Sequence, residues 1–342
     1  MPAAQAAGHG SWVGTLLIAG MKILVTGANG FIGRAMLARL LALPDAQVVG
    51  CVRAANVRAA LPQLDRASMV RVASGLSDAA DWSSALEGVQ GVVHTAAMVQ
   101  AMPAGEAGQL AQLRRINVQG TACLARQAAQ AGVRRFVFVS SIKVNGEATL
   151  PGQAYTADDL PLPVDAYGIS KWEAEQALWS IARSTGMELV VVRPPLVYGP
   201  GVKANFAALL RAVCRGWPLP LGALDNRRSY VALDNLVDFL AACLVDARAA
   251  NQTFVVSDGR DLSTRELVLG LARAAGVRAR LLPVPVWTLR LSATLLGRRA
   301  MAQRLCGNLQ LDNAKAQTML GWTPPLSVDE ALRRVVDGIA LR

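Results

Sequence analysis

A short apolar segment followed by closely spaced glycines constrains this chain more than any other feature. Residues 22–26 read K-I-L-V-T, the next seven read G-A-N-G-F-I-G, and an amphipathic stretch follows at 34–43. A buried strand, a glycine turn and a helix form the phosphate-binding unit of dinucleotide-binding domains. The spacing here is G-x-x-G-x-x-G rather than G-x-G-x-x-G. We therefore predict that a parallel sheet begins at this strand and that a dinucleotide binds at its first turn.

The glycines of this turn suit three tasks: a tight bend, close approach of backbone N–H groups to a pyrophosphate, and close packing of helix on strand. The predicted cofactor contacts are Gly27, Asn29, Gly30, Phe31, Ile32 and Gly33.

The residue after the second strand bears on the choice of cofactor. The strand at 47–52 is followed by Arg53, where sites that prefer NAD place an acidic residue. A guanidinium can pair with the 2′-phosphate of NADP through two hydrogen bonds. The sequence therefore favours NADP(H), with NAD(H) as the alternative. The competing interpretation is an exposed arginine at the end of a strand.

Strand and helix patterns continue to alternate along the first half of the chain. Further short apolar strands are predicted at 69–73, 91–94, 135–139 and 188–192, with helices near 78–87 and 109–131. This alternation predicts an α/β fold with a Rossmann-type, doubly wound parallel sheet.

The alternation stops at about residue 194, where proline and glycine begin to cluster. Such loops often shape a binding cleft. We predict a dinucleotide-binding domain over 21–193 with parts of 225–258, and a smaller C-terminal substrate-binding lobe mainly in 194–342. Residues 1–20 lack Lys and Arg, and their apolar run is short. They are expected to be a disordered or loosely attached extension, and stable membrane insertion is not predicted.

Composition limits the possible partners. The net charge is +11, but the arginines are scattered rather than gathered into a run or stripe, which favours a solvated surface over nucleic-acid binding. The five cysteines stand apart among apolar residues, as expected for buried thiols of a cytoplasmic protein. With only His9 and His94 in the chain, we predict no metal site, and His94 is expected to be structural.

A tyrosine and a lysine four residues apart are the strongest candidates for chemistry. Tyr167 and Lys171 would share one face of a helix, which places an ammonium near a phenol. That charge would lower the phenol pKa and allow proton exchange with a substrate hydroxyl. Ser141 is expected to hydrogen-bond the same oxygen. Alone, Y-x-x-x-K occurs by chance in many helices.

Six segments, taken together, indicate a protein family far more specifically than Y-x-x-x-K does alone. They are T-G-A-N-G-F-I-G at 26–33, H-T-A-A at 94–97, N-V-Q-G-T at 117–121, V-S-S-I-K-V-N-G at 139–146, Y-G-I-S-K at 167–171 and R-P-P-L-V-Y-G-P-G at 193–201. In this order they resemble the extended short-chain dehydrogenase/reductases, specifically the NAD(P)-dependent nucleotide-sugar epimerase/dehydratase family. The resemblance covers about residues 21–340.

The resemblance implies roles for particular residues. Ser141, Tyr167 and Lys171 would be catalytic, with hydride transfer at C4 of a UDP-linked hexose and Tyr167 moving the proton. Further cofactor contacts would be Ala96, Ala97, Asn117, Ser140, Tyr167, Lys171, Pro194, Leu196 and Val197. Substrate contacts would be Ser141, Asn205 and Arg228, with Arg227 as the alternative to Arg228. The family usually forms homodimers, here through helices near 109–131 and 166–186.

Three departures from the family pattern influence the predicted reaction. Gly75 stands where many relatives have an adenine-contacting Asp, Asn145 replaces a Tyr, and L-Q-L-D at 309–312 lacks an arginine found in UDP-galactose 4-epimerases. Together with Arg53, the missing arginine favours a 4-keto sugar reductase of bacterial polysaccharide biosynthesis. The alternative is a UDP-glucose or UDP-N-acetylglucosamine 4-epimerase with retained NAD. A non-catalytic dinucleotide-sensing protein is disfavoured because Tyr167 and Lys171 are both present.

The apolar stretch at 283–297 also allows two interpretations. It is predicted to be a lid or core helix of the smaller lobe, and the alternative is a helix that lies on a membrane surface.

Overall fold

The computed structural model describes residues 18, 20–43, 45–52, 68–71, 75–99, 105–295, 297 and 299–340. Its centre is a seven-stranded sheet in the order β10-β6-β5-β4-β1-β2-β3, in which every neighbouring pair is parallel. The strands are β1 (Lys22–Thr26), β2 (Gln47–Val52), β3 (Ser68–Arg71), β4 (Gly91–His94), β5 (Arg135–Val139), β6 (Glu188–Arg193) and β10 (Gln252–Val255). The strand order reverses between β1 and β4, so this crevice is a topological switch point, where ligands bind in such sheets. The predicted fold class is confirmed.

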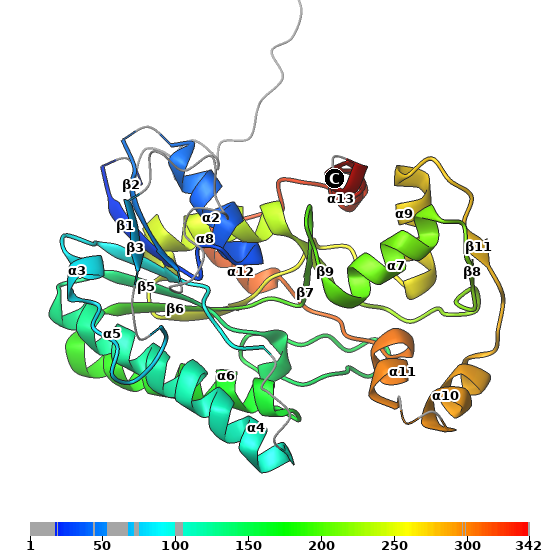
Figure 1. Cartoon of the computed structure of the whole chain (residues 1–342), viewed down its shortest axis with the longest axis horizontal. Helices are drawn as coiled ribbons and strands as arrows, with labels where there is room; N and C mark the ends of the chain where they lie inside the picture. The colour runs from blue at the N-terminus through cyan, green and yellow to red at the C-terminus, as the bar shows by residue number, and fades with distance from the viewer. Residues whose placement is uncertain are drawn as a thin grey trace, which may run out of the picture.

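Helices cover both faces of the sheet (Figure 1). One face carries α2 (Phe31–Leu41), α8 (Leu233–Val245) and α12 (Ala314–Leu320), and the other carries α3 (Ser83–Leu86), α5 (Thr121–Gln130) and α6 (Ala166–Thr185). Side chains alternate between the faces along each strand. In β1, Ile23 and Val25 therefore pack with α2 and α8, whereas Leu24 packs with α5 and α6.

A smaller lobe adjoins the carboxyl ends of the strands, on the right in Figure 1. It contains α7 (Ala204–Cys214), α9 (Thr264–Ala274), α10 (Val286–Leu295), α11 (Arg299–Cys306) and α13 (Val328–Ala340). Its two short parallel pairs join β7 (Leu196–Tyr198) to β9 (Tyr230–Ala232) and β8 (Pro218–Leu219) to β11 (Arg280–Leu281). Phe206, Leu210, Leu271 and Leu332 belong to a separate core in this lobe.

The long helix predicted at 109–131 has an irregular middle. It runs as α4 (Gly105–Leu113), a π-helical segment (Arg114–Gly120) and α5. Single π-helical turns inside α-helices occur frequently at functional sites, and this one contains Asn117. The helix predicted at 78–87 is shorter, since α3 covers only Ser83–Leu86. Positions 72 and 73 of the predicted third strand lie outside the described residues.

Two other expectations need correction. Cys51, Cys123, Cys243 and Cys306 are buried, but Cys214 is exposed, because it lies on the outer side of the last turn of α7. Most of residues 1–20 lie outside the described part, yet Ile18 is buried in the core beside α2. Within the described ranges, no helix has the length and apolar character needed to cross a membrane.

Candidate active site

The glycine turn between β1 and α2 leaves no room for side chains. Gly27 has φ +66°, and a Cβ there would lie 2.9 Å from the Ala96 backbone nitrogen. A Cβ on Gly33 would lie 2.1 Å from the Gly27 carbonyl oxygen. Gly30 caps α2 without a side-chain hydrogen bond, and the first turn contains no acidic residue. The helix N-terminus is therefore well suited to a pyrophosphate, and these residues fit a dinucleotide.

Replacing Gly33 with alanine should release the dinucleotide. The added methyl group meets backbone rather than a movable side chain, so the turn must deform; overpacking of this kind costs about 1–3 kcal/mol. We expect the affinity for the dinucleotide to fall about tenfold to a hundredfold. Calorimetric titration of the cofactor-stripped protein measures this. Ala38→Ser, at an exposed position of the same helix, is the control, and equal affinity in the two variants would contradict the assignment.

Asn117 connects three parts of the site. Its Nδ2 donates to the Met98 carbonyl at 2.9 Å and to Ser170 Oγ at 3.0 Å, and its Oδ1 accepts from the Met98 amide at 2.8 Å. The π-helical segment thereby holds the loop after β4, which contains Ala96 and Ala97, against α6. Asn117 is buried, and both the oxygen and the nitrogen of its amide are hydrogen-bonded within the protein. Its support for the site is therefore indirect, because it holds these neighbouring segments in place.

The remaining predicted cofactor positions differ in exposure. Pro194 is buried, and its carbonyl accepts from the Ile142 amide at 3.0 Å, which joins the end of β6 to the turn after β5. Val197 is half-buried and Leu196 is 45% exposed. Asn29 is exposed, and Phe31 and Ile32 are half-buried at the start of α2. Arg53 lies outside the described residues.

The serine pair lies where β5 ends. Ser140 is buried and donates to Glu175 Oε1 at 2.5 Å. Ser141 caps a short 3-10 turn (Ile142–Val144), and its Oγ accepts from the Lys143 amide at 3.3 Å. The two serines thus separate into a structural member that faces α6 and a half-buried member at the carboxyl edge of the sheet.

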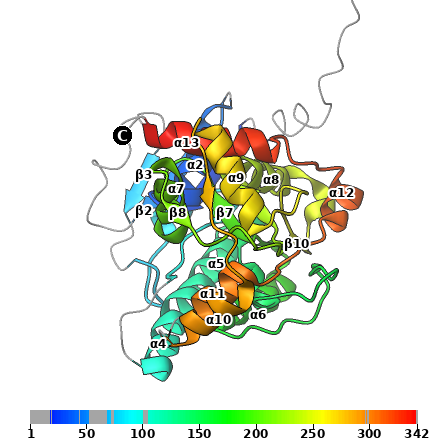
Figure 2. The same cartoon turned by 90° about the vertical axis from the view of Figure 1, so that its right-hand side faces the viewer.

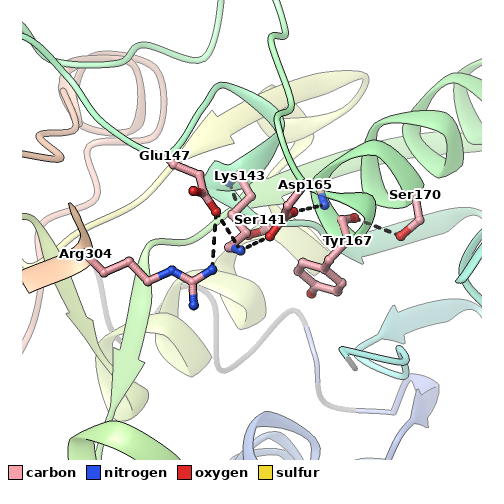
Figure 3. A network of polar contacts seen from close by, with 8 residues as sticks. Ser141, Lys143, Glu147, Asp165, Tyr167, Ser170 and Arg304 are labelled. Carbon is pink, nitrogen blue, oxygen red and sulfur yellow. Dashed lines mark hydrogen bonds and ion pairs between the residues drawn. The ribbon is translucent and has the colours of Figure 1, made fainter. Parts of the chain in front are cut away.

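Tyr167 lies in the first turn of α6 (Figure 3). Asp165 caps this helix, with Oδ1 accepting from the Gly168 amide at 2.7 Å. Burial raises the pKa of Tyr167 to about 12, and the negative charge of Asp165 acts in the same direction. The expected lowering of this pKa is therefore not found, and the phenol is protonated at neutral pH.

Lys171 lies one turn further along α6 and is fully buried. Its Nζ is 4.2 Å from the centroid of the Phe138 ring. Burial lowers its pKa to about 7, although the Glu175 carboxylate opposes this shift. Within the described part of the chain, no hydrogen bond links the Tyr167 phenol to Lys171 or Ser141. The sequence spacing predicted the shared helix face, but it did not reveal how strongly burial affects both groups.

A chain of ion pairs connects this site to the smaller lobe (Figure 3). Lys143 Nζ pairs with Asp165 Oδ2 and, at 3.1 Å, with Glu147 Oε1. Arg304 of α11 reaches the same Glu147 oxygen at 3.4 Å. Sequence reasoning missed Arg304 and searched at 309–312 instead. The available signal was R-L-C-G-N at 304–308, an arginine ahead of a Gly-Asn pair in place of Gly-Asp.

The structure also distinguishes the two candidate diphosphate arginines. Arg228 is half-buried and donates to the Gly307 carbonyl at 3.0 Å. Burial lowers its pKa, and the positive charge of Arg304 lowers it further. Arg227 is more exposed and pairs with Glu266 at 3.3 Å. Two guanidinium groups held near one another suit an anion with several oxygens. Asn205 is exposed in the first turn of α7.

His94 is fully buried at the end of β4. Its Nδ1 lies 2.7 Å from Thr26 Oγ1 and its Nε2 lies 2.9 Å from Thr121 Oγ1. Burial lowers its pKa to about 3, and the nearby charge of Lys171 contributes. The imidazole is therefore neutral at physiological pH. Both ring nitrogens are engaged by threonine hydroxyls, as expected for a structural residue.

His94 should make the protein sensitive to acid. An unfolded chain binds a proton at this imidazole below a pH of about 6.5, whereas the folded chain does not until about 3. Stability is thus lost as pH falls through this window, by about 2 kcal/mol at pH 5. Comparing urea unfolding of the wild type and His94→Gln at pH 7.5 and pH 5 tests this. The wild type should lose more stability on acidification, and equal losses would contradict it.

Fold and site together define a class of protein: a nicotinamide dinucleotide-dependent enzyme of the short-chain dehydrogenase/reductase type. The sequence profile of one family in this class, described as NAD dependent epimerase/dehydratase family, matches residues 23–257. The chain belongs to this family.

Individual relatives agree with this membership. The chain is 42% identical over 314 residues to a UDP-glucose 4-epimerase of Vibrio cholerae, which covers 92% of this chain and 94% of the relative. It is 30% identical to a 2-alkyl-3-oxoalkanoate reductase of Stenotrophomonas maltophilia, covering 92% and 98%. The crystal structure of UDP-glucuronic acid 4-epimerase from Bacillus cereus in complex with NAD superposes with a TM-score of 0.75 at 22% identity, covering 94% and 99%. That similarity supports the fold.

Proposed function

We propose that this protein is a UDP-hexose 4-epimerase that retains its NAD, acting on UDP-glucose or UDP-N-acetylglucosamine. The observation that supports the proposal is the chain of ion pairs that runs from Asp165, at the start of the Tyr167 helix, through Lys143 and Glu147 to Arg304, whose charge acts on Arg228. A diphosphate held by these arginines would direct the attached sugar toward the tyrosine. The long similarity to the Vibrio cholerae enzyme favours this reaction.

The proposed roles follow from the chemistry of each group. Bound NAD supplies reversible hydride exchange at C4. Tyr167 acts from its phenolate form, after the resting phenol has lost its proton to solvent: the phenolate takes the proton from the C4 hydroxyl and later returns it to the same oxygen, while Ser141 donates a hydrogen bond to that oxygen. Lys171 supplies a nearby positive charge that favours the phenolate from which this exchange starts. Arg228 and Arg304 bind the diphosphate, and Asn205 contacts it from α7. Over the full cycle the sugar is neither oxidised nor reduced.

The reaction favoured from the sequence was a 4-keto sugar reductase that consumes NADPH, with the epimerase as its alternative. It rested on Arg53 and on the missing C-terminal arginine. Arg304 fills the latter role from α11, so this part of the argument no longer favours a reductase. Arg53 still bears on cofactor choice: if its guanidinium binds a 2′-phosphate, Arg53→Ala will weaken NADPH binding far more than NADH binding. We expect equal, small effects on both.

Turnover without added cofactor tests the proposal. The purified protein is incubated with UDP-glucose, and separately with UDP-N-acetylglucosamine, while the anomeric protons are followed by NMR. We expect the corresponding galacto-isomer to form from at least one substrate. Turnover of a UDP-4-keto sugar that occurs only with added NADPH, with neither isomer formed, would instead establish the reductase. We also propose a homodimer through α4–α5 and α6, which sedimentation of the same sample would measure.

A further inference from the structure

Helix α10 presents an apolar stripe to solvent. Trp287, Leu291 and Leu295 are 67%, 53% and 79% exposed. They are four residues apart, so they lie along one side of the helix. The sequence predicted a lid or core helix here; none of the residues of α10 is buried, so the prediction of a core helix is wrong. Arg290, Leu291 and Thr294 of α10 also line a cavity of about 810 Å³, whose other walls include the loop at 148–151 and Gly307.

Two further exposed apolar side chains, Trp217 and Leu282, directly flank the β8–β11 pair in the sequence. Arg280 is in register with Pro218, which places the preceding Trp217 beside the strand that leads toward α10. Trp217 is 55% exposed and Leu282 is 48% exposed. Figure 2 shows β8 and α10 on the side of the molecule that faces the viewer. Two exposed tryptophans on one side suit a membrane–water interface, where amphipathic rings are enriched.

The charge of this region has a single sign. Residues 267–311 contain no Asp or Glu and seven arginines, namely Arg273, Arg278, Arg280, Arg290, Arg298, Arg299 and Arg304. Arg278, Arg280 and Arg290 are exposed. None of these three has an acidic partner among the described residues. An apolar stripe flanked by unpaired arginines complements a surface that is both apolar and negatively charged.

We propose that this surface docks on an anionic lipid bilayer, with α10 lying in the plane of the interface. The docking surface consists of Trp217, Leu282, Trp287, Leu291 and Leu295 with Arg278, Arg280 and Arg290. The aromatic and leucine side chains enter the region between head groups and acyl chains, and the guanidinium groups contact lipid phosphates. A helix of 10 residues is too short to span a bilayer. Leu291 and Arg290 line the cavity that contains Gly307, the hydrogen-bond partner of Arg228, whereas Trp217, Leu282, Trp287 and Leu295 are not among the residues that line it; the proposal does not depend on the proposed function.

Vesicle flotation of the full chain tests the proposal. One set of vesicles contains phosphatidylglycerol and phosphatidylethanolamine, and the other contains only phosphatidylcholine. We expect the protein to float with the anionic vesicles and the bound fraction to fall as salt increases. The triple variant Trp287→Ser/Leu291→Ser/Leu295→Ser should lower the partition coefficient at least about tenfold, because three interfacial side chains are lost. Epimerase turnover in vesicle-free solution should be unchanged in Trp217→Ser, because Trp217 is not among the residues that line the cavity.

Two further measurements keep the test decisive. Thermal melting shows whether the triple variant is folded. Trp217→Ser lies outside α10 and should weaken vesicle binding by itself, so it tests the proposal even if the triple variant unfolds. Sedimentation velocity without lipid examines self-association. Equal flotation of wild type and Trp217→Ser, or no flotation of the wild type, would overturn the proposal. So would self-association that the α10 substitutions abolish, because the surface would then be an interface between copies of this chain.

Discussion

Replacing Tyr167 with phenylalanine is expected to lower kcat by about 10²–10⁴, the usual contribution of a positioned acid–base group. The substitution removes one hydroxyl and keeps the ring that fills the start of α6. The phenol is protonated at rest, since burial raises its pKa to about 12. Proton exchange therefore depends on this oxygen and on the charges around it. Turnover of the UDP-hexose followed by NMR measures the loss.

The control for this experiment is retention of the dinucleotide. Tyr167→Phe should bind it as the wild type does, because the glycine turn and Asn117 are untouched. Ser170→Ala offers a matched comparison on the same helix: its hydroxyl donates to the Tyr167 carbonyl at 2.8 Å and accepts from Asn117, without reaching the phenol. Near-normal turnover of Tyr167→Phe would remove the proton-transfer role.

The largest effect on stability is expected at the Glu175–Arg193 pair. Arg193 donates from Nε to Glu175 Oε1 at 3.0 Å and from Nη2 to Oε2 at 2.6 Å, and the two side chains are 4% and 0% exposed. Breaking a buried pair leaves an uncompensated charge, which costs about 3–5 kcal/mol. Arg193→Met should therefore lower the free energy of unfolding by about this amount, as measured by urea denaturation.

A double-mutant cycle distinguishes the pair from ordinary packing. Glu175→Leu removes the other charge, and the double variant leaves neither member of this pair as a lone buried charge. We expect the double variant to be more stable than Arg193→Met, because apolar replacement of a complete buried pair is often close to neutral. Additive losses would show that the two side chains contribute separately and that their charges are not strongly coupled.

The same buried network explains a departure from the family pattern. Asn145 stands where a Tyr was expected, and it is buried. Its Oδ1 accepts from Arg193 Nη1 at 3.1 Å, and its Nδ2 donates to the Thr156 carbonyl at 3.1 Å. The short amide side chain of Asn145 thus accepts a hydrogen bond from one guanidinium N–H of Arg193, beneath the turn that contains the two serines. The sequence showed the substitution but gave no indication of its partner, which lies 48 residues away.

Local patterns predicted the parts of the molecule that depend on neighbouring residues. Strands β1, β2, β4 and β5 begin and end at the predicted residues, because short apolar runs between turns have few alternatives in a parallel sheet. The glycine turn was likewise evident, since both its sequence and its geometry are local. Y-x-x-x-K correctly placed two side chains on one helix face.

These local patterns could not predict features that depend on contacts between residues far apart in the sequence. Arg304 reaches Glu147 across 157 residues, and neither residue marks the pairing in its own segment. The pKa values of Tyr167 and Lys171 follow from burial, complete for Lys171 and partial for Tyr167, which spacing alone does not reveal. Helix α10 was predicted as a lid or core helix because it is apolar, but apolar composition does not indicate whether a partner element covers a helix.

The central claim is that the dinucleotide stays bound through a closed cycle, and its most direct test is to denature the purified protein and identify what it releases. We predict NAD(H) in an amount of about one per chain, from a protein that interconverts UDP-hexose epimers with nothing added. A protein that releases no dinucleotide, and that oxidises added NADPH only in the presence of a 4-keto UDP-sugar, would contradict the epimerase and establish a reductase.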